Sequence, residues 1–323
     1  MLPVVKTINV VKQFFSEDVF RHPVLVDVVE QIDFVHQSSS NAVNFSLLVT
    51  GLSRSGKSFT GRRYESIHST YSIDGVIQRP VLYVKLNGTR NPADLLNQII
   101  EALGSSSAKK GTEPFKIQNR LVKLIKGHGV QLIFIDEIQD CLPMSDGKLA
   151  QNMAKQICRL IDEAHIPFIL LGTPSAKRLI NLQFGIKNEK RTLLGSTEEE
   201  QASGRFLAPL TLCPIFPRTN TWIECVRFFI TKYNVIDDIT DSKPLLNRIY
   251  VATEGRMGVL DKLIYVFSSK EFKTESTLLK LERAYKLAIS TNPKNPFNEE
   301  SFSDHTIHTM TIHMEPNTDD LIC

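Results

Sequence analysis

A single loop constrains the fold of this chain more than any other feature of the sequence. The residues from Gly51 to Ser58 have the pattern G-x-x-x-x-G-K-S, which is the spacing of a phosphate-binding loop. Its glycines allow successive backbone N–H groups to curl around phosphate oxygens. An apolar run at residues 45–50 precedes the loop and a helical pattern follows it, as such a loop requires. A Gly/Ser-rich turn that matches by chance is the alternative, and this strand–loop–helix context disfavours it.

The side chains around this loop predict a nucleoside triphosphate bound with Mg²⁺. Lys57 would reach the β- and γ-phosphates, and the Ser58 hydroxyl would ligate the metal. The helix that follows the loop would turn its positive dipole end to the same phosphates. We therefore expect a nucleoside triphosphate and Mg²⁺ as cofactors, with nucleotide contacts from Gly51, Ser53, Arg54, Ser55, Gly56, Lys57, Ser58 and Phe59; the resemblance described below implies that the nucleotide is ATP.

A second motif points to nucleotide hydrolysis. The apolar run at residues 132–135 is followed by two adjacent carboxylates, Asp136 and Glu137. Asp136 would hold Mg²⁺ through water, and Glu137 would orient and polarise a water molecule for in-line attack on the γ-phosphate. An ordinary strand followed by an acidic turn would look the same in isolation. A small-molecule kinase would also bind ATP in this way, but it would not usually place a glutamate directly after the metal-binding aspartate.

A third apolar run, at residues 167–172, ends in the hydroxyl of Thr173. A parallel sheet would place this side chain beside Asp136, because the carboxyl ends of parallel strands meet at one edge. Thr173 could there hydrogen-bond the attacking water or the γ-phosphate. A simple Gly-Thr-Pro turn is the alternative.

The alternation of apolar and amphipathic segments along the chain predicts the fold around these motifs. Short apolar runs at 45–50, 81–85, 132–135, 168–171 and 206–212 alternate with amphipathic stretches at 57–66, 92–103, 115–126 and 149–164. Strands that are apolar on both faces and separated by helices form parallel sheets covered on either side. We therefore expect an α/β fold with a parallel five-stranded sheet flanked by helices.

The chain divides into four expected segments. Residues 1–40 carry helical spacing, 41–214 form the nucleotide-binding α/β domain, 215–290 form a small helical domain, and 291–323 form a flexible or partner-binding tail. In the tail, His305, His308 and His313 alternate with Thr and Ile. This alternation favours a polar tail or an added edge strand on a partner over a metal site.

Composition excludes several classes of protein. Thirty-eight Lys plus Arg against thirty-five Asp plus Glu give a net charge of +3, far below that of a histone-like DNA binder, so any nucleic-acid contact must be local. The N-terminus lacks a signal-peptide pattern, and no apolar run approaches the ~20 residues that span a bilayer. The five cysteines are scattered, without a Cys-x-x-Cys pair. We expect a cytoplasmic protein with no membrane partner.

The order of the motifs resembles that of the AAA+ ATPases over residues 40–270: phosphate loop, Asp-Glu strand, polar sensor strand, arginine before the last strand, and helical lid. Within that class, four strings look like the TnsC/TniB family of transposition regulators, which are related to the replication-initiator branch. They are Ile135-Asp-Glu-Ile-Gln-Asp140, Leu170-Leu-Gly-Thr-Pro174, Ser203-Gly-Arg-Phe206 and Thr253-Glu-Gly-Arg-Met-Gly-Val-Leu260.

The resemblance implies roles for two arginines. Arg205 matches the arginine finger, which reaches the γ-phosphate held by a neighbouring subunit, so it implies an oligomer. Arg256 matches the sensor arginine that reports the γ-phosphate to the lid. A surface salt bridge is the alternative for each. Lys190 and Arg191 are rival candidates for the trans-acting role.

The resemblance further implies an ATP-loaded ring or helical filament on duplex DNA that links a target-selection protein of the TniQ type to a transposase and disassembles on hydrolysis. The matching DNA-facing region follows the second strand, and donors suited to backbone contact are Lys85, Thr89, Arg90, Lys116 and Arg120. Solvated loop and helix faces are the alternative for these side chains.

Two other functions remain open at this point. A replication initiator or helicase loader would share every nucleotide motif. A scaffold that uses ATP for assembly alone, with negligible hydrolysis, is the third possibility, and the adjacent carboxylates Asp136 and Glu137 argue against it.

Overall fold

The computed structural model describes residues 10–38, 44–89, 91–143, 148–180, 204–235, 239–269, 276–290 and 294–314. The chain forms two compact units. The first comprises Met1–Phe14, Val26–Gly51 and Lys57–Leu212, and the second comprises Phe15–Leu25, Leu52–Gly56 and Cys213–Cys323. The short segment Leu52–Gly56, inside the phosphate loop, therefore groups with the second unit.

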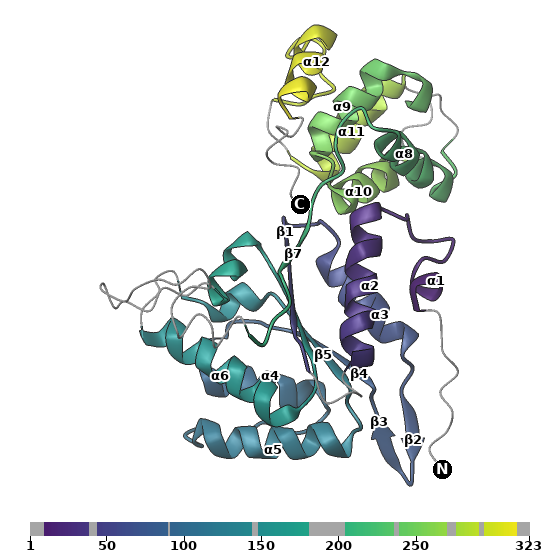
Figure 1. Ribbon diagram of the computed structural model, residues 1–323. Helices are drawn as coiled ribbons and strands as arrows, with labels where there is room; N and C mark the ends of the chain where they lie inside the picture. The colour runs from purple at the N-terminus through teal and green to yellow at the C-terminus, as the bar shows by residue number, and fades with distance from the viewer. Residues whose placement is uncertain are drawn as a thin grey trace. The chain divides into compact units, whose positions relative to one another are not determined.

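A parallel five-stranded sheet forms the centre of the first unit (Figure 1). In spatial order, its strands are β4 (Val81–Lys85), β5 (Leu132–Asp136), β6 (Phe168–Gly172), β1 (Leu47–Gly51) and β7 (Leu210–Leu212). Every residue of β1, β5 and β6 is buried. These three strands are apolar on both faces because helices cover both sides of the sheet. The predicted α/β fold with a parallel five-stranded sheet is confirmed.

Helices lie on both faces of this sheet. Figure 1 shows α2 (Pro23–Ser38) and α3 (Lys57–Ile67) on one side, and α4 (Pro92–Ala102), α5 (Pro114–Gly127) and α6 (Lys148–Ala164) on the other. A short helix, α1 (Val10–Phe14), packs near α3. The largest apolar cluster lies between the sheet and α4, α5 and α6, which fixes the ends of the strands in space.

A β-hairpin that the sequence analysis did not predict lies between α3 and β4. Its strands are β2 (Tyr71–Ile73) and β3 (Val76–Gln78), and they pair antiparallel. Asp74 and Gly75 turn the chain with φ of 49° and 80°, as the favoured two-residue hairpin turn demands.

The second unit is helical. It contains α8 (Asn220–Lys232), α9 (Lys243–Thr253), α10 (Met257–Phe267), α11 (Thr277–Ala288) and α12 (Asp304–His313). Side chains such as Trp222, Ile249 and Leu260 form its own apolar core. Ser and Thr side chains cap four of these helices, which explains where they begin. None of the described helices combines the length and hydropathy that crossing a bilayer requires.

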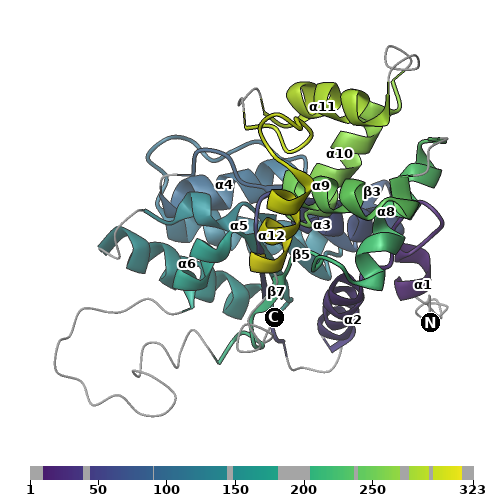
Figure 2. The same ribbon diagram turned by 90° about the horizontal axis from the view of Figure 1, so that it is seen from above.

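The expectation of a polar tail or an edge strand at residues 305–313 is wrong. These residues form α12, which Figure 2 shows beside α9. Ser303 caps the helix by accepting a hydrogen bond from the Thr306 backbone. Arg248 of α9, only 2% exposed, donates to Asp304 Oδ1 at 2.7 and 3.0 Å and to the Phe302 carbonyl at 2.9 Å. The Thr/Ile/His alternation is overridden by this cap and by the clamp that Arg248 forms.

Replacing the buried guanidinium tests this clamp. We expect Arg248→Met to lower the free energy of unfolding of the second unit by about 2 kcal/mol, because it leaves buried carbonyls without donors. Lys286→Met is the control. Lys286 is half-exposed, and its ion pair with Glu282 stabilises the fold by less than about 1 kcal/mol. Urea denaturation would measure both, and equal losses would contradict the clamp.

Candidate functional site

The phosphate loop connects the carboxyl end of β1 to the first turn of α3. Arg54 and Gly56 have φ of 63° and 107°, so the loop backbone turns through left-handed conformations that expose successive N–H groups to one side. Lys57, which is 7% exposed, folds its side chain back to donate to the Gly51 carbonyl at 2.7 Å. The first turn of any α-helix leaves N–H groups without intrahelical acceptors, and here that turn begins at the loop.

The loop fits an anionic ligand. Ser55 is 4% exposed, and its buried hydroxyl has no hydrogen-bond partner among the described residues. Burial lowers the pKa of Lys57, while the nearby Asp136 and Glu137 raise it. A phosphate group would supply both a partner for the hydroxyl and a counter-charge for the lysine. Ser53 and Arg54 are exposed at the loop.

Asp136 lies at the carboxyl end of β5, next to β6 in the sheet. It is fully buried; its Oδ1 accepts from the Glu137 backbone at 2.9 Å and its Oδ2 from the Tyr83 hydroxyl at 2.5 Å. The oxygens of Asp136 and Ser58 are the ligands that Mg²⁺ prefers. Within the described residues, no group of three or more His, Cys, Asp or Glu could hold a metal by itself. These residues therefore suit a metal that arrives with nucleotide phosphates.

Glu137 and Thr173 are joined by a side chain that the sequence analysis did not single out. Gln139, in the short 3₁₀ turn Ile138–Cys141, donates to Glu137 Oε2 at 2.5 Å and accepts from the Thr173 backbone N–H at 3.0 Å. Glu137 has φ of 58°, a left-handed backbone conformation that ends the extended strand at this residue. The Thr173 hydroxyl pairs with Ser175 at 2.7 Å. The only sequence signal for Gln139 was its place two residues after Glu137.

Gly172 explains why Gln139 can approach β6 so closely. A Cβ at Gly172 would lie 2.8 Å from the Ile138 side chain and 2.9 Å from Gln139 Oε1. Any larger residue would push the 3₁₀ turn away from the strand. The glycine before Thr173 is thus part of the site's geometry.

Arg205 lies at the opposite end of β1 from the loop. Its carbonyl accepts from the Ser46 backbone at 2.8 Å, just before β1 begins, whereas the loop leaves β1 at Gly51. Its guanidinium donates twice to Asp162 of α6, at 2.6 and 2.7 Å. Arg205 therefore lies far from the loop of its own protomer and forms the surface salt bridge that is the alternative to a finger role. Its rivals Lys190 and Arg191 lie outside the described residues.

Arg256 is the N-cap residue of α10, and this helix contacts Arg54 in the loop segment Leu52–Gly56, which belongs to the same unit. The Gly258 N–H donates to the Arg54 carbonyl at 3.1 Å, and a Cβ on Gly258 would come within 2.9 Å of that oxygen. The Arg256 guanidinium pairs with Glu254 at 3.0 Å and donates to the Thr253 carbonyl. The first turn of α10 is thus attached to the phosphate loop, two residues after the candidate sensor.

Phe59, a predicted nucleotide contact, is exposed, whereas Thr89, a predicted DNA contact, is buried. Phe59 is 46% exposed and meets Phe14 edge to face at 6.1 Å. Thr89 is 5% exposed and accepts from Gln98 at 2.9 Å, so its hydroxyl stabilises its own loop in this structure. Its contact with DNA stays a prediction.

Among the described residues, the basic side chains predicted to contact DNA are more exposed than Thr89. Lys85 is exposed and lies opposite Asp136 in the sheet register, beside the nucleotide residues. Lys116 is exposed with a loose ion pair to Glu113 at 3.2 Å, and Arg120 is partly buried. Arg90 lies outside the described residues.

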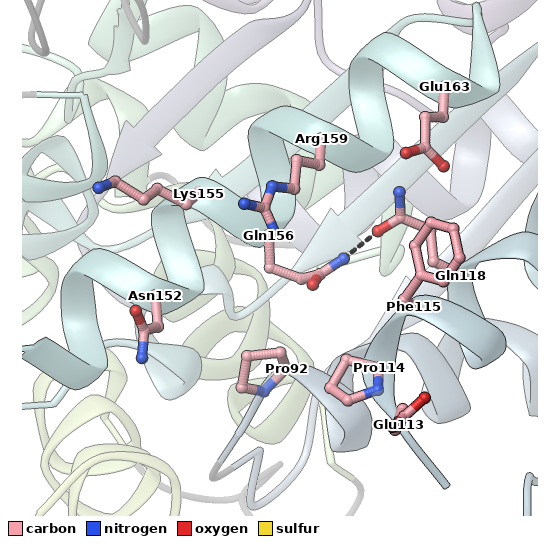
Figure 3. A pocket seen from close by; sticks show the side chains of 10 residues that line it. All are labelled: Pro92, Glu113, Pro114, Phe115, Gln118, Asn152, Lys155, Gln156, Arg159 and Glu163. Atoms are coloured by element: carbon pink, nitrogen blue, oxygen red, sulfur yellow. Dashed lines mark hydrogen bonds between the residues drawn. The ribbon is translucent and has the colours of Figure 1, made fainter.

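A separate groove of about 570 Å³ opens between α5 and α6. Figure 3 shows its side chains, with Gln156 donating to Gln118 across the groove. It is lined by Pro92, Glu113, Pro114, Phe115, Gln118, Asn152, Lys155, Gln156, Arg159 and Glu163. No residue of the phosphate loop lines it, so it is distinct from the nucleotide site.

This sheet order, with a phosphate loop after β1 and paired carboxylates at the end of β5, defines the AAA+ ATPase fold. Solved structures agree on that fold. The ORC2 protein of Aeropyrum pernix, solved as ADPNP-ADP complexes, matches with a TM-score of 0.55 and 13% identity over 87% of this chain and 73% of its own. The ORC1 protein of the same organism, in complex with DNA, matches with a TM-score of 0.54 and 16% identity over 84% of this chain and 66% of its own.

The family follows from the sequence. The family model described as the bacterial TniB protein matches residues 11–188, more than half of the chain, and the chain belongs to this family. The resemblance stated from the motifs is thereby confirmed. No curated protein matches the sequence significantly.

The bridge made by Gln139 generates a test. We expect Gln139→Ala to lower ATP turnover on the order of 10- to 100-fold, since a freed Glu137 is misplaced for its water, while nucleotide affinity stays within about twofold. Steady-state turnover and fluorescent-nucleotide binding would separate these effects. Gln151→Ala, in the first turn of α6, is the matched control because it removes the same side chain and leaves the Gln139 hydrogen bonds in place. A parallel loss of affinity and turnover would mean that Gln139 only supports the fold.

Proposed function

We propose that this protein is an ATP-hydrolysing regulator of DNA transposition. The observation that carries the proposal is the meeting of Lys57, Asp136 and Glu137 at the carboxyl ends of β1 and β5, the two strands that flank β6, in a member of the TniB family. Thr173, at the end of the strand between them, supports the same function through its link to Glu137. The similarly folded ORC2 protein was solved as ADPNP-ADP complexes, which is consistent with a nucleotide ligand here.

Each side chain has a distinct task in this proposal. Lys57 and the N–H groups of the loop hold the phosphates, and Ser58 and Asp136 hold Mg²⁺, which neutralises charge on the β- and γ-phosphates. Glu137 orients and polarises the attacking water, with Gln139 fixing its carboxylate. Thr173 contributes a hydrogen bond at the same edge.

Arginines extend the site beyond one protomer in this proposal. Arg205 leaves Asp162 to reach the γ-phosphate held by the neighbouring subunit, where it stabilises transition-state charge. Arg256 senses the same phosphate, and the attachment of α10 to the loop at Arg54 would carry that information to the helical unit.

Assembly on DNA is the proposed output. ATP at subunit interfaces favours a ring or helical filament on duplex DNA, and hydrolysis removes the contacts that hold it together. Lys85, Arg90, Lys116 and Arg120 would contact backbone phosphates, and their effect would be multiplied along the filament. The assembled form would link a TniQ-type target selector to a transposase. Membership of the TniB family and the similar fold of ORC1, which was solved in complex with DNA, support this proposal.

A replication initiator or helicase loader is the second candidate function. The similarity of the fold to ORC1 and ORC2 favours it, and the nucleotide chemistry would be the same. The family assignment favours transposition, because the matching model is that of TniB and covers the phosphate loop and both acidic residues.

Electron microscopy of the protein with duplex DNA tests the proposal directly. We expect ordered rings or filaments with a non-hydrolysable ATP analogue and none with ADP, because the γ-phosphate holds the interfaces. Monomers in both states would favour a loader that assembles only with a partner protein. Assembly equal in both states would contradict control by ATP.

Two substitutions separate binding from hydrolysis. Glu137→Gln should lower ATP turnover about 100-fold or more while filaments on DNA persist longer, since the base is lost and the phosphate contacts remain. Lys57→Ala should abolish both nucleotide binding and stable DNA binding. Turnover of Glu137→Gln equal to wild type would favour a scaffold with negligible hydrolysis.

Mixing variants tests the trans role of Arg205. Arg205→Ala and Lys57→Ala are each expected to be inactive alone, because one lacks the finger and the other lacks the phosphate site. Mixed subunits should recover part of the ATP turnover, since some interfaces then combine an intact finger with an intact loop. No recovery at any mixing ratio would count against Arg205 and favour Lys190 or Arg191.

A further inference from the structure

Tyr83 connects the two side chains that suit Mg²⁺. It lies in the middle of β4, and its hydroxyl donates to Asp136 Oδ2 at 2.5 Å. Burial and Asp136 raise the pKa of Tyr83, whereas the Ser58 hydroxyl, which lies within hydrogen-bonding reach of the same phenol, works to lower it. One phenol thus links the end of β5 to the first turn of α3, at the two positions that a metal bound with nucleotide would contact.

The surroundings of Tyr83 hold its ring in this place. A Cβ on Gly61 of α3 would come within 2.8 Å of the Tyr83 ring, so only glycine lets the ring pass beside the helix. Glycine inside a helix costs about 1 kcal/mol relative to alanine, and the close approach of the ring is a physical reason for its presence here. The Arg62 guanidinium lies 5.7 Å from the ring centre, and the Tyr83 backbone N–H donates to Glu65 at 2.9 Å.

We propose that Tyr83 is a positioning residue for the magnesium site, orienting Ser58 and Asp136 from outside the coordination shell. This inference rests on the proposed function, since it requires ATP and Mg²⁺ to bind at this loop. It adds a residue of β4 to a site whose other members come from the loop, β5 and β6.

The hydrogen-bond inventory allows both tasks at once. A carboxylate oxygen has two acceptor positions, so Asp136 can accept from Tyr83 and still face a metal or its water. The Ser58 hydroxyl can donate to Tyr83 while its oxygen lone pairs coordinate a metal. The phenol therefore orients both groups without occupying the metal position.

A purely structural role for Tyr83 would require fewer polar neighbours around its hydroxyl than the structure shows. Burial of a tyrosine requires one hydrogen-bond partner for its hydroxyl, and Asp136 alone would satisfy it. The Ser58 hydroxyl, the other group suited to the metal, also lies within hydrogen-bonding reach of the Tyr83 phenol. Partners of this outer kind typically contribute about 10- to 100-fold to metal affinity.

Tyr83→Phe tests this inference by removing only the hydroxyl. Binding of a fluorescent ADP analogue would be measured as Mg²⁺ is raised, and bound Mn²⁺ would be measured by electron paramagnetic resonance with ADP present. We expect the metal concentration for half-maximal effect to rise about 10-fold, while metal-free ADP binding stays within about twofold. Tyr64→Phe is the matched control, since Tyr64 is a buried tyrosine of α3 whose hydroxyl contacts Asp33 and His36 instead.

The outcomes separate this inference from the proposed function. Unchanged metal dependence in Tyr83→Phe would overturn the positioning role while leaving the nucleotide site intact. Equal loss of metal-free and metal-dependent binding, or equal shifts in both variants, would show that the ring only supports the fold. Failure of the wild-type protein to bind ADP at any Mg²⁺ concentration would overturn the proposed function itself, and this inference with it.

Discussion

The carboxyl ends of parallel strands meet at one edge of the sheet, and the chemistry of this protein depends on that constraint. β1, β5 and β6 are buried along their whole length, so they can present a polar group to a ligand only at their carboxyl ends, as β5 does with Asp136. Polar side chains can appear only where the strands end. The phosphate loop, the paired carboxylates and Thr173 therefore converge although more than thirty residues separate each from the next in sequence.

Convergence alone does not orient the side chains, and buried hydrogen bonds supply the orientation. Each buried polar group must find a partner, so the partners that remain available decide which way a side chain points. Gln139 uses both ends of its amide, one on Glu137 and one on the Thr173 backbone. The Tyr83 hydroxyl donates to Asp136 and lies within hydrogen-bonding reach of Ser58. Two neutral side chains thus determine the geometry of the charged ones.

The sequence predicted the sheet well because short, continuous apolar runs between helical patterns are typical of buried parallel strands. It missed β2 and β3 because each strand is only three residues long and largely exposed, so no buried run marks them. It mistook α12 for a polar tail or an edge strand, since alternation of Thr, Ile and His mimics a strand period and the sequence around α12 does not show its hydrogen bonds to Arg248. Tyr83 and Gln139 were missed for the same reason: their partners are set by tertiary contacts, and no motif encodes them.

The ion pair between Arg205 and Asp162 would have to break before Arg205 could contact a nucleotide on a neighbouring subunit. Both side chains are partly exposed, and water screens such a pair, so even with its two hydrogen bonds it contributes on the order of 1 kcal/mol. Moving the guanidinium from Asp162 to a phosphate of a neighbouring subunit would therefore cost little. A triphosphate carries more charge than one carboxylate, and an interface excludes water, so the exchange would favour the assembled state. Loss of the γ-phosphate would reverse that balance, and Asp162 would then recapture the arginine. An arginine with a weak partner in its own protomer is compatible with a role in trans, and it offers a physical reason why assembly would follow the state of the nucleotide.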